Sequence, residues 1–264
     1  NTFQNCAALA METGYHNRLV LGNGGIQLAD VVIADNVYTD GQQPSGGGGN
    51  REVIRIITGK RVRITGNVFT DWKYIMHAIM IGVELRWVDS SSPSDVTAAL
   101  PVPQDVVVDG NTFTCIDSNT SIRAVNVFAA KRTNVTNNVV SIERDLVAGE
   151  INAVVLGATM APEIEDTLFE HNHIQFTGDT SAATSAAGFG NQPATAAACA
   201  GLTIQNNHVV DGVYGVYTRT TSTDCIAVDN TTSTCSAGNS YSATTKTFTG
   251  GQALNFGSVP AHSE

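Results

Sequence analysis

The sequence feature that most constrains the fold is a ten-residue pattern that recurs along the chain. Its clearest copy is VVVDGNTFTC, residues 106–115, where an alternating apolar segment leads to Asn111 and an aromatic residue follows two places later. Further copies recur at intervals of 27 to 44 residues. For the last copy we prefer Asn239 to Asn230, because Tyr241 restores the aromatic residue. The marker asparagines are then Asn1, Asn36, Asn67, Asn111, Asn138, Asn172, Asn207 and Asn239.

Each copy alternates like a strand with one face turned inward. The residues three and five places before the asparagine are mostly apolar, such as Val108 and Val106. A third apolar run lies elsewhere in most repeats, which predicts three strands per repeat and a solenoid of three-sided coils. These runs are 53–57, 78–83, 124–128, 153–156 and 213–217. We expect about seven coils within residues 1–241, and a C-terminal tail or cap over 242–264.

The recurring asparagine has a physical explanation. Asparagine tolerates the left-handed backbone conformation at a sharp corner, and its amide both donates and accepts hydrogen bonds. We therefore expect the asparagines to stack from coil to coil as a buried ladder at one turn.

With this repeat the chain resembles the pectin-lyase-like superfamily of right-handed parallel β-helices, whose second turn carries such a ladder. The resemblance implies an all-β parallel β-helix. It also implies a ligand groove along the outer face of the sheet formed by the third apolar runs. The superfamily includes lyases, hydrolases, phage tailspikes, adhesins and structural proteins, so the fold does not select one function.

Composition limits the partners. The net charge is −10, which disfavours nucleic acid as a partner because phosphate binding needs a basic surface. No apolar run approaches the ~20 residues of a membrane span. Low charge and abundant Ser and Thr favour an extracellular or secreted protein, or one on a virion surface. In that setting Cys225 and Cys235 are candidates for a local disulfide. A chain that begins on Asn1 without Met is expected to be a trimmed piece.

The outward row of the third sheet is expected to contain Arg55, Met80 and Asn126, and to continue through Val154 and Tyr214. This row has no carboxylate, whereas glycoside hydrolysis needs two. The catalytic motifs of polygalacturonases, pectate lyases and alginate epimerases are missing, so no catalytic residue is carried over from the family. No cofactor is predicted, and a bound calcium ion is left open.

The densest group of reactive side chains follows Asn67. A lyase needs a base for proton removal and a cation beside the uronate carboxylate. Four residues suit these catalytic roles: Lys73, Tyr74, His77 and Arg86. Substrate-binding roles fall to Arg55, Trp72, Glu84, Trp87, Lys131 and Arg132. The alternative is that these are loop charges and rim aromatics around a coil.

Two further patterns concern stacking. Lys60-Arg61 and Lys131-Arg132 precede Asn67 and Asn138 at matching places, which suggests either a track for an anionic polymer or a polar turn. His173 and His208 each follow a ladder asparagine and should stack, as a surface pair or, less simply, as part of a metal site.

Two functions remain in competition. The first is a β-helix that binds an acidic polysaccharide or cell-surface glycan. If it also cleaves this ligand, β-elimination is expected rather than hydrolysis. The second is a non-catalytic structural or adhesive β-helix, such as a phage spike, a surface adhesin or a filament subunit. Either one is compatible with a homo-oligomer, as a trimer or a filament.

Overall fold

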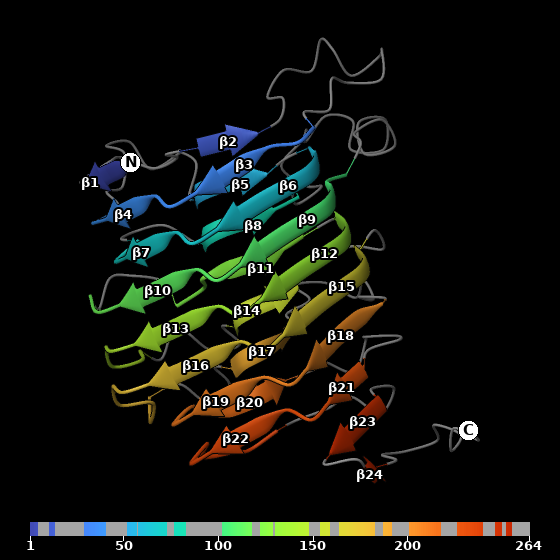
Figure 1. Cartoon of the computed structure of the whole chain (residues 1–264). Coiled ribbons are helices and arrows are strands. Elements are labelled where there is room, and N and C mark those ends of the chain that lie inside the picture. Colours follow the sequence, from blue (N-terminus) through green and yellow to red (C-terminus); the bar gives the residue numbers. More distant parts are fainter. Residues whose placement is uncertain are drawn as a thin grey trace, which may run out of the picture.

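The computed structural model describes residues 1–4, 11–13, 29–40, 52–56, 58–72, 77–82, 102–117, 122–128, 130–147, 154–158, 164–182, 187–191, 201–217, 226–239, 246–249 and 252–254. Within these ranges the regular elements are strands, and they form three long sheets (Figure 1). All the pairings between neighbouring coils are parallel. The chain is therefore a parallel β-helix, as the repeat predicts. None of the described residues belongs to a helix that is long and apolar enough to cross a membrane.

The first sheet contains the strands that follow the ladder asparagines. Its order is β1-β4-β7-β10-β13-β16-β19-β22. The bounds are β1 Thr2–Gln4, β4 Val37–Thr39, β7 Val68–Thr70, β10 Thr112–Cys115, β13 Val139–Ile142, β16 His173–Phe176, β19 His208–Val210 and β22 Thr231–Ser233.

The second sheet contains the third apolar runs. Its order is β2-β5-β8-β11-β14-β17-β20. The bounds are β2 Met11–Thr13, β5 Glu52–Ile56, β8 His77–Ile81, β11 Val125–Val127, β14 Val154–Ala158, β17 Ala187–Asn191 and β20 Tyr214–Tyr217.

The third sheet contains the strands that lead into the ladder. Its order, from the C-terminal end, is β24-β23-β21-β18-β15-β12-β9-β6-β3. The bounds are β3 Val32–Ala34, β6 Lys60–Thr65, β9 Gln104–Asp109, β12 Ala130–Thr136, β15 Ile164–Glu170, β18 Leu202–Gln205, β21 Ile226–Val228, β23 Lys246–Thr249 and β24 Gln252–Leu254. β23 continues this sheet parallel to β21, and β24 pairs antiparallel with β23.

The core lies between the three sheets and is made of the inward residues of every coil. Along the first sheet the rings of Phe3, Tyr38, Phe69 and Phe113 stack with centroids 4.8 to 5.0 Å apart. They occupy the slot two places after the ladder asparagine, so the sequence pattern directly sets this column of rings.

The ladder is continuous from Asn1 into the C-terminal half. Each side-chain Nδ2 donates to Oδ1 of the asparagine in the next coil at 2.9 to 3.0 Å. From Asn36 on, the backbone N–H donates to the same oxygen. Because each ladder amide from Asn36 on is buried, these bonds satisfy groups that water does not reach.

The final ladder position is Asn230, so the preference for Asn239 is wrong. Asn230 Oδ1 accepts from Asn207 Nδ2 at 2.9 Å. β22 begins at Thr231 and pairs with His208, which places Asn230 in register with Asn207. Thr232 fills the slot where an aromatic residue was expected. Asn239 instead accepts a hydrogen bond from the backbone of Val216 at 2.8 Å.

The left-handed conformation also lies one residue earlier than expected. The residue before each ladder asparagine from Asn36 on has φ between 49° and 65°. These residues are Asp35, Gly66, Gly110, Asn137, His171, Asn206 and Asp229. The ladder asparagine therefore supplies the hydrogen bonds, and its predecessor turns the corner.

Candidate functional site

The outer face of the second sheet carries the predicted row in register. Arg55 pairs with Met80, and Met80 pairs with Asn126. The row continues through Gly157 and Gly190 to Tyr217, so the predicted continuation through Val154 and Tyr214 is wrong. Val154 and Tyr214 both pair with Ala187 in a separate row.

The strict alternation of inward and outward residues is also broken in β5. Val53 and Ile54 are consecutive and both belong to the hydrophobic core. Two inward residues in succession change the side on which the preceding residue lies, so Glu52 contacts Arg55 three places later. A carboxylate therefore adjoins a row that was predicted to lack one.

Four buried side chains from β5, β8 and β11 form what we call the polar cluster: Glu52, Arg55, His77 and Asn126. Arg55 Nε donates to Glu52 Oε2 at 3.0 Å, and Arg55 Nη2 donates to the same oxygen. His77 Nδ1 lies 3.8 Å from Glu52 Oε1, beyond hydrogen-bond distance. His77 Nε2 lies 3.0 Å from Asn126 Nδ2, and the His77 ring meets Phe128 edge to face.

Burial and charge set the ionisation of the polar cluster. Burial raises the pKa of the Glu52 carboxyl, but His77 and Arg55 together outweigh burial and hold that pKa below its ordinary value. Burial lowers the pKa of His77, which therefore stays neutral at pH 7. An ionised carboxylate and a neutral imidazole thus lie side by side.

Asn126 occupies Nε2 of the His77 ring, whereas Nδ1 is buried without a hydrogen-bond partner among the described residues. With Asn126 Nδ2 donating to Nε2, the proton of the neutral ring sits on Nδ1, on the side of Glu52. His77 is also only 1% exposed. The arrangement suits the positioning of polar groups, and proton abstraction by His77 requires that Asn126 first release Nε2.

Of the other residues predicted around His77, Trp72 is described and does not join this cluster. Trp72 is 1% exposed and meets Phe113 edge to face in the core, so it is not a rim aromatic. Its predecessor Asp71 has a φ of 48° and turns the chain there. Lys73, Tyr74, Glu84, Arg86 and Trp87 lie outside the described residues.

At the C-terminal end of the same face, two tyrosines form a half-buried pair that the sequence did not single out together. The rings of Tyr214 and Tyr217 have centroids 5.1 Å apart. Their partners in the preceding coil, Ala187 and Gly190, have little or no side chain. A Cβ on Gly190 would lie 1.9 Å from the carbonyl oxygen of Tyr217, so only glycine fits there.

Three of the four residues of the predicted basic track pair with carboxylates. Lys131 Nζ lies 2.8 Å from Glu165, and Arg132 Nε lies 2.6 Å from Asp105. Arg61 binds Asp30 through two nitrogens at 2.6 and 2.7 Å. The hydrogen bonds from Arg132 lower the pKa of the Asp105 carboxyl. These basic residues are thus partners of carboxylates and not a free cationic stripe.

These residues belong to a column that we call the corner row: Asp30, Arg61, Asp105, Arg132 and Asp166. All five have φ between 52° and 58° and occupy the same corner of consecutive coils. Acidic and basic residues alternate along it, so each charge has an opposite charge in an adjacent coil.

The histidine stack is present as expected. The rings of His173 and His208 have centroids 5.2 Å apart and planes 15° apart. His208 Nδ1 also contacts Thr231 Oγ1 at 2.6 Å. Among the described residues, no three His, Cys, Asp or Glu side chains are grouped to hold a metal ion. Cys235 is a free thiol in the structure, which therefore does not contain its predicted bond to Cys225, a residue outside the described ranges.

No protein-family model matches the chain. No curated protein matches its sequence either. Among solved structures, one similar fold is a mutant tailspike protein of the E. coli bacteriophage HK620 in complex with a pentasaccharide. The alignment covers 94% of this chain and 58% of the tailspike chain. Its identity is 11% and its TM-score 0.36. A second is PfbA, a surface adhesin of Streptococcus pneumoniae. That alignment covers 94% of this chain and 78% of the PfbA chain, with 10% identity and a TM-score of 0.30. We draw no functional argument from likenesses this distant.

Proposed function

We propose that this parallel β-helix is a glycan-binding protein whose ligand lies along the outer face of the second sheet. The observation that carries the proposal is the half-buried pair Tyr214 and Tyr217, whose register partners in the preceding coil are Ala187 and Gly190. Aromatic rings with a polar hydroxyl suit a sugar, because the apolar face of a pyranose packs on the ring while its hydroxyls bond to the rim.

The polar cluster supports the same proposal from the N-terminal end of the face. It gathers a carboxylate, a guanidinium, an imidazole and an amide from three successive coils. Burying such groups costs free energy that a well-packed apolar patch would not cost. Clusters of this kind with shifted pKa values are typical of functional sites.

An acidic polysaccharide as ligand, and its cleavage by β-elimination, form the finer part of the proposal. Lys73, Tyr74, His77 and Arg86 retain the proposed catalytic roles, with Arg55 alongside as a substrate-binding residue. The contact of His77 with both Glu52 and Asn126 favours binding over cleavage in the conformation described. A glycan-binding protein that does not cleave matches the alternative of an extracellular or virion-surface adhesin.

The test is a glycan array followed by titration calorimetry with the glycans that bind, including oligogalacturonate. We expect Tyr217→Ala to weaken binding about three- to tenfold and the matched control Tyr217→Phe to preserve it, since the phenyl ring keeps the stacking surface. Incubation with polygalacturonate, read by the absorbance of an unsaturated uronate, separates a lyase from an adhesin. Equal affinity for both Tyr217 variants and the wild type would refute the proposed site.

A further inference from the structure

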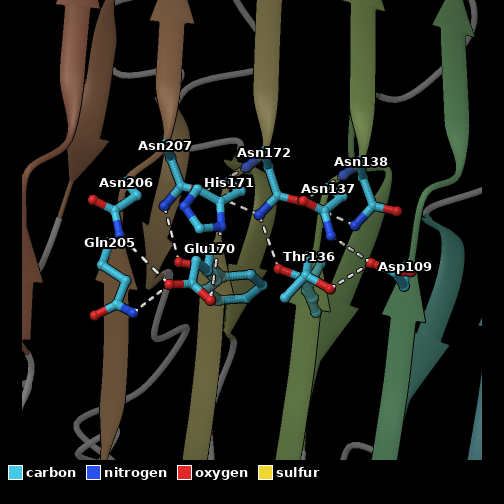
Figure 2. A network of polar contacts seen from close by, with 12 residues as sticks. Asp109, Thr136, Asn137, Asn138, Glu170, His171, Asn172, Gln205, Asn206 and Asn207 are labelled. Atoms are coloured by element: carbon cyan, nitrogen blue, oxygen red, sulfur yellow. Dashed lines mark hydrogen bonds and ion pairs between the residues drawn. The ribbon is translucent and has the colours of Figure 1, made fainter.

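A second polar surface lies on the third sheet, beside the ladder corner. We call it the polar stripe, and Figure 2 shows its side chains. It comprises the two residues that precede the ladder asparagine in four consecutive coils, apart from Gly110. Its members are Asp109, Thr136, Asn137, Glu170, His171, Gln205 and Asn206.

Each carboxylate of the polar stripe is held by the next coil through one oxygen. Asp109 Oδ1 accepts from Thr136 Oγ1 at 2.7 Å and from Asn137 Nδ2 at 2.8 Å. Glu170 Oε1 accepts from Gln205 Nε2 at 2.6 Å and, more weakly, from Asn206 Nδ2 at 3.5 Å. The side chains are thus fixed before any ligand arrives, which lowers the entropy cost of binding.

The arrangement leaves acceptors for a ligand. Within the described part of the chain, no hydrogen-bond donor reaches Asp109 Oδ2, and His171 Nδ1 stays 3.9 Å from Glu170 Oε2. No donor among the described residues bonds to the side-chain amide oxygens of Asn137, Gln205 and Asn206 either. Lys131 and Arg132 lie at the other end of β12, near its N-terminal start, where carboxylates already bind them.

From this geometry we infer that the polar stripe is a second binding site, for an uncharged, extended glycan lying parallel to the helix axis. Sugar hydroxyls donate to the free carboxylate oxygens, and such charge-assisted bonds are strong. The stripe spans three strand spacings, ~14 Å. Successive coils lie ~4.8 Å apart, so two coils match roughly one disaccharide of an extended polymer. Asp109 and Glu170 repel uronates, and at two coils apart they are too distant to share one calcium ion.

This inference rests on the proposed function, because it takes the ligand to be a glycan. The probe is cellohexaose, a neutral extended oligosaccharide, titrated into labelled protein while the side-chain amide resonances of Asn137, Gln205 and Asn206 are followed. We expect these resonances to shift on binding. We expect Asn206→Gly to weaken that binding about three- to tenfold through the lost hydrogen bond. Glycine keeps the left-handed conformation that Asn206 adopts, at a φ of 52°.

The matched control is Asp35→Gly, which makes the same backbone change outside the stripe and should leave the affinity for cellohexaose unaltered. Oligogalacturonate should shift the stripe resonances far less than cellohexaose does. Unshifted stripe amides at millimolar cellohexaose, or equal binding by Asn206→Gly and Asp35→Gly, overturn the inference. The array and the Tyr217 variants report on the other face, so failure there is read separately.

Discussion

Replacing Asn111 by alanine tests how much of the stability of the fold depends on the ladder. The Asn111 amide takes part in five hydrogen bonds: two from Asn67 to its Oδ1, and three from its Nδ2 to Asn138, Ile64 and Asp109. Alanine removes them all and leaves the buried backbone N–H of Asn67 without its acceptor. An orphaned buried donor costs ~1–3 kcal/mol and each other lost bond about 1 kcal/mol. We therefore expect a loss of roughly 5–7 kcal/mol in the free energy of unfolding.

Urea unfolding followed by far-ultraviolet circular dichroism measures this loss. The control is Asn137→Gly, an exposed asparagine two places before β13, whose side chain donates only to Asp109 and whose φ of 53° suits glycine. Its cost should stay below about 1 kcal/mol, as for most surface substitutions. An Asn111→Ala protein that unfolds within about 1 kcal/mol of the Asn137→Gly control would show that the ladder does not stabilise the coils as argued.

Three further outcomes are expected. Phe113→Ala should cost ~3–5 kcal/mol in unfolding free energy, because it leaves a cavity between Phe69 and Trp72; a loss near zero by urea titration contradicts this. The pKa of His77 is lowered in the folded state, so stability is fully present above the unfolded value of ~6.5 and falls as pH drops below it. His77→Gln should therefore flatten the melting-temperature profile between pH 7 and 5, and an unchanged slope speaks against the buried neutral ring. Lys131→Ala should leave polygalacturonate affinity within twofold in a binding titration, because Glu165 already binds the ammonium group.

The coil architecture was predictable because its determinants are local and repeat. The asparagine, the inward residues before it and the ring two places later recur in each coil, so several weak signals support one register. The error at Asn239 arose where that repetition weakens, since Thr232 replaces the ring that the pattern leads one to expect.

The candidate site was less predictable, since it depends on departures from the pattern. Glu52 reaches Arg55 because Val53 and Ile54 both face the core, and strict alternation does not anticipate this. β17 lies in a segment rich in Ala, Thr, Ser and Gly that is absent from the apolar runs from which the third strands were predicted. Its glycines are required by close approach, for a Cβ on Gly188 would lie 2.7 Å from a methyl group of Val209.

The corner row has a consequence for how the length of this protein can change. Its signs alternate from coil to coil, so excising the coil that contains Arg61 would set Asp30 against Asp105, and like charges in direct register repel. Excising two successive coils would restore an acidic residue beside a basic one. Through this part of the molecule the helix therefore has a parity, and lengthening or shortening it by an even number of coils preserves the pairing that an odd number destroys.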